Sequence, residues 1–191
     1  MTTFVDVEFI DENSLHHYIT HSTDLTEVSF TGGIAAASST YSGLNAPNAF
    51  VPPDGSAYEE TKHLWAAVNP VLPAFIWYDF QRRSICPSKV SFLPRQDNLE
   101  WAIRNMATKY QFLGSNDETC NPQSSWTLLC EDLSGKKIKS FDESRGCEVV
   151  NARSWGVQNK YRCISLKILE LGQYQNGAMA NVYNIRVWEQ C

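Results

Sequence analysis

The stretch from Pro73 to Arg95, PAFIWYDFQRRSICPSKVSFLPR, constrains the fold more than any other part of the sequence. It holds two apolar-rich runs, Phe75–Phe80 and Lys89–Leu93, separated by a short polar connection. Both runs alternate and are dense in β-branched and aromatic residues, and in the second run Val90 and Phe92 share one face. This pattern is typical of strands with one buried face. We therefore expect both runs at the centre of a β-sheet core.

Other short alternating runs extend this pattern along the chain. They are Tyr110–Gly114, Trp126–Cys130, Arg162–Glu170 and Ala180–Glu189, with a further edge-type run at Thr3–Ile10. An Asn-Gly pair at 176–177 is a strong hairpin-turn signal between the last two strands. Many short strands separated by turn clusters predict an all-β, antiparallel sandwich or jelly roll.

One segment has the period of a helix instead. In Asp97–Thr108, the apolar residues Leu99, Ala102, Ile103 and Met106 form a short helical stripe. We expect a short helical insertion on the sandwich. No internal repeat and no linker divides the chain, so its 191 residues predict one domain with a sizeable core.

Charge and hydropathy narrow the function classes. The net charge of −5 argues against a protein that binds nucleic acid by bulk charge. No run of about 18 apolar residues occurs, so no transmembrane helix is expected. The start MTTFVDVEFIDEN lacks the basic and apolar regions of a signal peptide, and no N-glycosylation acceptor occurs. These features predict a cytoplasmic protein, with a secreted one as the alternative.

The six cysteines leave two states open. Their even number permits three disulfides, but a domain of this size needs none. The compartment predicted above favours reduced, mostly buried thiols. The spacings contain no Cys-x-x-Cys motif and no Cys/His cluster, so a zinc site is not expected.

Catalytic signals are sparse. His17 and His21 are four residues apart and would share a helix face, as in a metal pair, but no third ligand is near and a solvated polar segment is favoured. The sequence contains no nucleophile elbow, HExxH, P-loop or GxGxxG motif. A non-enzyme is therefore expected, with a hydrolase on a β-sandwich scaffold as the weakest alternative.

The order of several elements resembles a known family. ASSTYSGLNAPNAF, Trp65, PAFIWYDF, KVSFLPR, FLGSNDE…WTLL, YRCISLKILEL and VYNIRVWE follow one another as in discoidin domains, also called coagulation factor 5/8 type C domains. The resemblance covers residues 28–191 and leaves 1–27 as an N-terminal extension packed on the domain. It implies a galactose-binding-like jelly roll. The cysteine that usually opens such a domain is missing here, although Cys191 stands where the closing one would.

The resemblance implies a non-catalytic binding module whose ligand loops cluster at one end. Family members bind carbohydrate, phospholipid head groups or protein. The long proline-rich loop Tyr41–Val71 fits such a functional role. A sugar site needs flat aromatic surface and planar polar groups. The residues with this chemistry in or beside the mapped loops are Tyr41, Asn45, Trp65, Arg95, Asn116 and Asp117.

The family also suggests a structural calcium ion. Oxygen ligands from the loop around Asp54 and a carboxylate on the last strand, Glu189, would suit Ca²⁺ better than a transition metal. In this sequence Val51 stands where the family often has an aspartate, and Asp54 follows three residues later.

Two main functions remain open at this stage. The first is a lectin-like module for carbohydrate recognition or adhesion, with a glycan as partner. The second is an intracellular protein-interaction module on the same fold. Phospholipid binding ranks lower because Glu59 and Glu60 follow the apolar tip Phe50–Val51 and would repel anionic head groups. A homo-oligomer is a further expectation, because one weak sugar site is usually useful only when multiplied.

Overall fold

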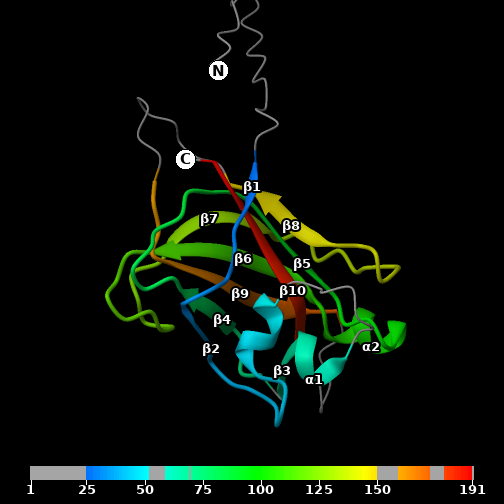
Figure 1. Cartoon of the computed structure of the whole chain (residues 1–191). Helices are drawn as coiled ribbons and strands as arrows, with labels where there is room; N and C mark the ends of the chain where they lie inside the picture. The colour runs from blue at the N-terminus through cyan, green and yellow to red at the C-terminus, as the bar shows by residue number, and fades with distance from the viewer. Residues whose placement is uncertain (1–24, 52–58, 69, 150–158, 173–178, 191) are drawn as a thin grey trace, which may run out of the picture.

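The fold was examined in a computed structural model, which describes residues 25–51, 59–68, 70–149, 159–172 and 179–190. Short strands dominate it, and the helical segments are all brief (Figure 1). The elements are β1 (Thr26–Glu27), β2 (Ile34–Ala37), the 3-10 helix η1 (Ala46–Phe50), α1 (Glu60–His63), β3 (Leu64–Val68), β4 (Ala74–Asp79), β5 (Pro87–Leu93), α2 (Leu99–Asn105), β6 (Ala107–Ser115), β7 (Thr127–Asp132), β8 (Arg145–Glu148), β9 (Cys163–Leu171) and β10 (Met179–Glu189).

The strands form two antiparallel sheets that face each other. The first sheet has the order β1-β10-β5-β8, and β3 also pairs with β10. The second sheet has the order β2-β4-β9-β6-β7. This is the predicted all-β jelly-roll sandwich, and that prediction is confirmed. The predicted edge run Thr3–Ile10 and the Asn-Gly turn at 176–177 lie outside the described residues.

β4 and β5, which correspond to the runs Phe75–Phe80 and Lys89–Leu93, lie in different sheets. In β5, Val90 and Phe92 are buried and alternate with more exposed residues, as the period predicts. β4 differs, because all six of its residues are buried. Its outward residues Phe75 and Trp77 pack in a second apolar cluster with Leu113 and the Cys120–Cys163 disulfide. A strand covered on both faces loses the alternation between buried and exposed positions.

Strand β10 lies at the centre of the first sheet. It pairs with β1 and β3 along one edge and with β5 along the other. A register shift between Tyr183 and Arg186 interrupts the pairing with β5, and Asn184 within it has a φ of 47°. This bulge changes the direction of the side chains midway along the strand.

The predicted helical insertion is α2. Asn98 precedes it, and its side-chain oxygen accepts a hydrogen bond from Trp101 N at 3.0 Å, as expected for an N-cap. Ala102 lies on the buried face of the helix. The Asn105 side chain accepts a hydrogen bond from Met179 N, which ties the end of α2 to the start of β10. None of the helices among the described residues is long and apolar enough to cross a membrane.

The cysteines contradict two predictions. Cys120 is bonded to Cys163 with a Cα–Cα distance of 6.5 Å, Cys130 to Cys147 at 5.9 Å, and Cys86 is disulfide-bonded as well. No described cysteine is a free thiol. The prediction of reduced thiols was therefore wrong. So was cytoplasmic localisation, because disulfides persist in oxidising compartments and indicate a secreted or extracellular protein. The spacing of cysteines in the sequence did not reveal the bonded pairs, because the fold of the two sheets brings them together.

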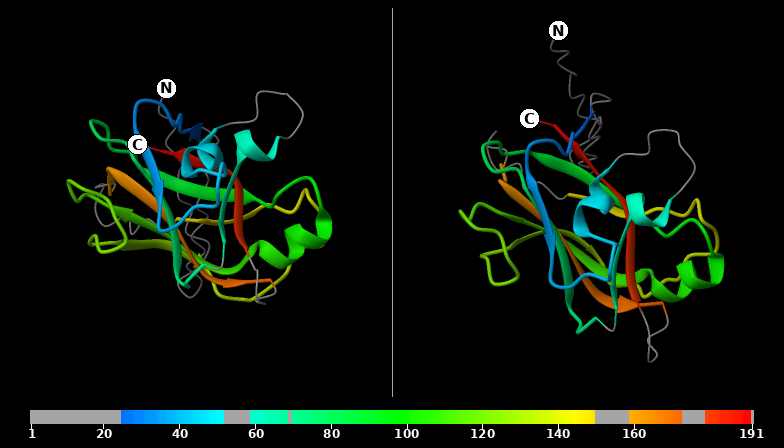
Figure 2. Two further views of the ribbon diagram at one scale, coloured as in Figure 1. Left: turned by 90° about the horizontal axis from the view of Figure 1, so that it is seen from below. Right: turned by 60° about the horizontal axis from the view of Figure 1, so that its bottom comes forward.

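The two ends of the sandwich carry different segments. Residues 94–105, with α2, form what we call the α2 end. The ends of β4 and β6 meet the start of β9, since Cys163 pairs with both Asp79 and Ser115. This places residues 80–86, 116–126 and 159–162 together at what we call the Arg162 end. Figure 2 shows α2 and the loop between β6 and β7 at opposite ends of the molecule.

We expect each disulfide to stabilise the fold. Cys130–Cys147 joins β7 of one sheet to β8 of the other and closes a loop of 17 residues, whereas Cys120–Cys163 closes one of 43. Replacing either pair with serines should lower the free energy of unfolding by about 3 kcal/mol, because the unfolded chain regains conformational freedom. Urea unfolding without reductant measures this. Wild type in reductant is the control and should be less stable than either variant. If both double-serine variants unfold at the same urea concentration as wild type, the assigned disulfides would be contradicted.

Candidate functional site at the α2 end

Arg95 follows β5 directly and is almost completely buried, with 1% of its surface exposed. Its guanidinium makes a two-pronged ion pair with Asp97, with Nε at 2.6 Å from Oδ1 and Nη2 also bonded to the carboxylate. This pair lowers the pKa of Asp97 below its usual value. The side chain of Asp97 is 38% exposed, so an ionised carboxylate is held in a fixed orientation and faces solvent.

Trp101 completes this group of residues. It lies in the first turn of α2 and is 46% exposed, which is unusual for so large an apolar side chain. The guanidinium carbon of Arg95 lies 4.9 Å from the centroid of the Trp101 ring. The cation thus supports the indole through a cation–π contact while part of the ring stays open to solvent. We call Arg95, Asp97 and Trp101 together the Trp101 surface.

The sequence identified only part of this surface. Arg95 was predicted as a site residue, but Trp101 was not. The sequence does contain a feature that indicates Trp101, because this residue lies outside the apolar stripe that α2 turns toward the core. A tryptophan on the polar side of an amphipathic helix is expected to be exposed, and an exposed tryptophan suggests a ligand surface.

Three other predicted residues come from the long loop and from β3. Tyr41 is 46% exposed, and its backbone N–H bonds to the carbonyl of Ala66. Asn45 is exposed at the start of η1, where its side chain makes no capping hydrogen bond. Trp65 is fully buried, and its indole N–H donates to Ser39 O at 3.1 Å. A ligand therefore cannot stack on Trp65 in this structure.

The loop that carries Tyr41 and Asn45 packs against β3 and β10. Its Leu44 packs in a small cluster on β3 and β10 that includes Tyr183 and, at its edge, Leu93. Leu93 is the last residue of β5 and lies two residues before Arg95. This cluster includes none of Tyr41, Asn45 and Arg95 themselves. A role in binding for Tyr41 and Asn45 stays a prediction.

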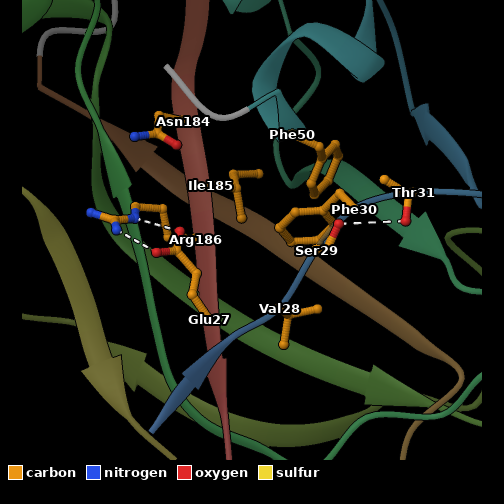
Figure 3. Close-up of a pocket in the computed structure, with 9 residues that line it drawn as sticks. All are labelled: Glu27, Val28, Ser29, Phe30, Thr31, Phe50, Asn184, Ile185 and Arg186. Atoms are coloured by element: carbon orange, nitrogen blue, oxygen red, sulfur yellow. Dashed lines mark hydrogen bonds and ion pairs between the residues drawn. The ribbon is translucent and has the colours of Figure 1, made fainter. Parts of the chain in front are cut away.

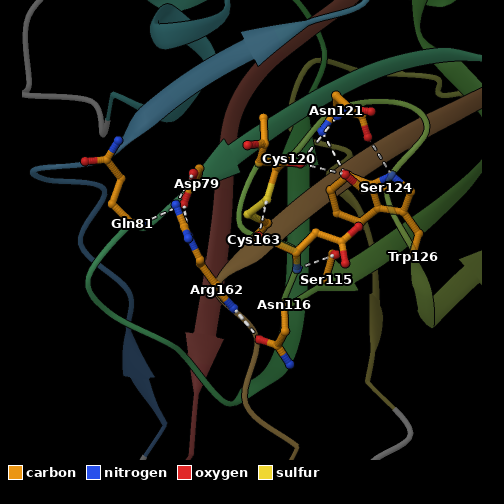
Figure 4. Close-up of a disulfide and its surroundings, with 12 residues drawn as sticks. Asp79, Gln81, Ser115, Asn116, Cys120, Asn121, Ser124, Trp126, Arg162 and Cys163 are labelled. Carbon is orange, nitrogen blue, oxygen red and sulfur yellow. Dashed lines mark hydrogen bonds and ion pairs between the residues drawn. A yellow bond between two sulfur atoms is a disulfide. The ribbon is translucent and has the colours of Figure 1, made fainter.

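Asn116 lies elsewhere, at the Arg162 end (Figure 4), and Asp117 follows it in the same loop after β6. The amide of Asn116 donates to Lys160 O and accepts from Arg162 N, both at 2.9 Å. The Asp117 carboxylate accepts a hydrogen bond from Ser125 N at 2.7 Å. Both side chains hold loop backbone in place, and the sandwich separates them from Arg95. Their binding role also stays a prediction, but they do not share one site with the Trp101 surface.

A second arginine–carboxylate pair stabilises the Arg162 end. Arg162 donates to Asp79 at 2.8 and 3.0 Å, which raises the pKa of the guanidinium (Figure 4). Asp79 also lies close to the sulfurs of Cys120 and Cys163 in a cluster with metal-ligand spacing. These sulfurs form a disulfide and are not thiolates, so the cluster does not offer the ligands of a thiolate metal site.

The predicted calcium ligands are only partly described. Asp54 lies outside the described residues. Glu189 ends β10, and its carboxylate accepts a hydrogen bond from Cys86 N at 3.4 Å. Calcium binding by these two residues therefore stays a prediction.

Comparison with known proteins identifies the fold. No family model and no curated protein matches the sequence. Among solved structures, a family 32 carbohydrate-binding module of C. perfringens NanJ in complex with galactose is similar at a TM-score of 0.58 and 15% identity, over 86% of this chain and 99% of that one. A second such module, from a Clostridium perfringens family 31 glycoside hydrolase, has a TM-score of 0.61 and 13% identity, over 86% of this chain and 95% of that one. The chain has the fold of the family 32 carbohydrate-binding modules.

Other proteins with the family 32 fold extend this comparison. The lectin domain of lectinolysin, solved with Lewis B antigen, has a TM-score of 0.54 at 13% identity over 84% of this chain and 94% of that one. The resemblance to galactose-binding-like jelly rolls noted in the sequence is therefore confirmed at the level of fold.

The Arg95–Asp97 pair predicts a pH dependence of stability. Because the pKa of Asp97 is lower in the folded than in the unfolded chain, the pair stabilises the fold above about pH 4 and this contribution is lost as the pH falls through the folded pKa. Asp97→Asn should therefore reduce stability at pH 6 and reduce it less at pH 3, as measured by urea unfolding.

The matched control is Asp142→Asn, which removes a carboxylate from an exposed turn. The difference in unfolding free energy between Asp142→Asn and wild type should not become smaller between pH 6 and pH 3. If Asp97→Asn lowers the free energy of unfolding equally at pH 6 and pH 3, the assigned ion pair would be contradicted.

Proposed function

We propose that this chain is a non-catalytic carbohydrate-binding module that binds a glycan at the Trp101 surface. The observation that carries the proposal is the half-exposed indole of Trp101, supported by a buried arginine whose carboxylate partner faces solvent. An aromatic face beside a fixed planar hydrogen-bonding group is the chemistry that a sugar ring requires.

Each of the three residues has a separate task in this proposal. The Trp101 ring contacts the C–H face of a sugar, and the Asp97 carboxylate accepts hydrogen bonds from hydroxyl groups. Arg95 is too buried to provide a broad contact, and it orients both neighbours through the ion pair and the cation–π contact. Because Arg95 neutralises Asp97, the surface favours neutral sugars over cationic ligands.

Proteins of similar structure support this class of ligand. Titles among them name galactose, a GalNAc-β-1,3-galactose disaccharide and Lewis B antigen as bound ligands. Two other similar structures are described as chitosan-binding modules. The fold thus accommodates several glycans, and the glycan preference of this chain depends on its own surface residues.

The described residues also support a role without catalysis. Their thiols are joined in disulfides, which removes thiolate nucleophiles from this part of the chain. The one described histidine, His63, is buried, and its Nδ1 accepts a hydrogen bond from Glu59 N. This ring nitrogen is thus engaged in local structure, which argues against a role for it as a general base.

Substitution of Trp101 tests the proposal. On a glycan array and in calorimetry with the best hit, Trp101→Ala should weaken binding by about fivefold or more, because stacking on an aromatic ring contributes about 1–3 kcal/mol. Trp101→Phe should retain part of the affinity. Repeating the array with EDTA shows whether calcium contributes.

The control is Leu128→Ala on β7, an apolar residue with an exposure of 48% that nearly equals that of Trp101. It should bind like wild type. A folded wild-type protein that binds no glycan would overturn the proposal, as would binding that Trp101→Ala leaves unchanged.

A further inference from the structure

A cavity of about 580 Å³ opens on the other edge of β10, away from β5. It lies between the middle of β10, the segment that leads from β1 toward β2, and the last residue of η1 (Figure 3). Its volume falls in the range typical of small-ligand sites. The lining residues are Glu27, Val28, Ser29, Phe30, Thr31, Phe50, Asn184, Ile185 and Arg186.

One wall of the cavity is apolar and firmly held. Phe30 and Phe50 contribute their rings, whose centroids lie 5.0 Å apart. Both rings pack against Tyr78 of β4, with centroid distances of 5.0 and 5.2 Å. Because this aromatic group belongs to the main core, the wall is preorganised before any ligand arrives.

Asn184 supplies a polar group at the same cavity. It is 4% exposed and adopts a φ of 47° in the bulge of β10. Its side-chain amide makes no hydrogen bond with any of the described residues, and its nitrogen and oxygen are not fully buried, so they are accessible from the cavity. A side chain with one acceptor and two donor hydrogens thus lines the cavity without a protein partner.

The rim is polar but carries no unbalanced charge. The hydroxyls of Ser29 and Thr31 lie 3.4 Å apart at the edge of the cavity. Arg186 forms a two-pronged ion pair with Glu27, with Nε at 2.7 Å from Oε1. The two charges neutralise each other, so the rim does not select an anion or a cation.

We propose that this cavity is a second binding site, which takes one ring of a neutral polyhydroxylated ligand such as a monosaccharide unit. The apolar wall contacts the C–H face of the ring, and the Asn184 amide and the two hydroxyls bond to its hydroxyl groups. The site is separate from the Trp101 surface because β10 lies between them: Arg95 continues from β5 on one edge, and the cavity opens on the β1 edge. The inference goes beyond the proposed function, which concerns the Trp101 surface alone.

Two sites on one chain have a functional consequence. Weak binding of single sugar units at separate positions combines into higher avidity for a branched or repeating glycan. A single copy of the chain would then bind a polysaccharide at two positions, or cross-link two polysaccharides, without forming an oligomer.

NMR titration of the ¹⁵N-labelled protein tests the second site, with galactose, N-acetylgalactosamine and glucose as separate probes. The side-chain amide of Asn184 and the backbone amides of residues 29–31 should shift saturably with at least one sugar. Asn184→Gly removes the amide while keeping a residue that tolerates the positive φ, and it should weaken binding at this site about tenfold. Thr31→Val, which replaces only the hydroxyl, should weaken it severalfold.

The Trp101→Ala variant separates the two proposals. It should leave the shifts at Asn184 within twofold of wild type, while it removes shifts around α2. Shifts at Asn184 without any at α2 would support the second site and overturn the proposed function. Absence of saturable shifts at Asn184 with all three sugars would overturn the second site, and so would an affinity there that neither Asn184→Gly nor Thr31→Val changes.

Discussion

The pairing of β10 with strands on both of its edges organises the rest of the structure. β5 lies on one edge and β1 and β3 lie on the other, while Val182, Ile185 and Val187 of β10 point into the core. Because β10 is central, both candidate surfaces are placed relative to it: Arg95 follows from β5, and the cavity lined by Asn184 opens on the β1 side. The bulge at Asn184 allows one residue to leave the alternating pattern and face the cavity.

Two arginine–carboxylate pairs show how similar interactions serve different purposes. Arg162 and Asp79 at one end are surrounded by a disulfide and by loop backbone that Asn116 holds. Arg95 and Asp97 at the other end lie beneath a half-exposed tryptophan. One member of each pair is buried, Asp79 at the first end and Arg95 at the second, and a buried charge requires a partner because an unpaired one is strongly destabilising. The pair therefore fixes local geometry in both cases, and only at the α2 end does that geometry present an aromatic face to solvent.

The architecture was largely predictable from the sequence, and the site only in part. Alternation in β5 and the helical stripe of α2 depend on burial of one face, so their periods are visible in the residues. The arrangement of the site was not visible, because Arg95 and Asn116 come from loops at opposite ends of the sandwich and their separation depends on strand order. The burial of Trp65 was not visible in the sequence either. This residue was predicted in the binding site, but it lies on β3 with its side chain buried in the core.

The sequence by itself determined the all-β class and the helical insertion, because periodicity and turn residues act locally along the chain. The jelly roll was implied by the resemblance to discoidin domains. Of the three residues of the Trp101 surface, the sequence pointed to Arg95 alone. The tertiary structure alone decided which side chains meet. Packing of the two sheets brought Cys130 of β7 to Cys147 of β8, and the resulting disulfide contradicts the predicted cytoplasmic localisation. The tertiary structure also placed Arg95 beneath Trp101, and Asn184 beside Phe30 and Phe50, because contacts between sheets and across loops depend on the whole topology and leave no period in the sequence.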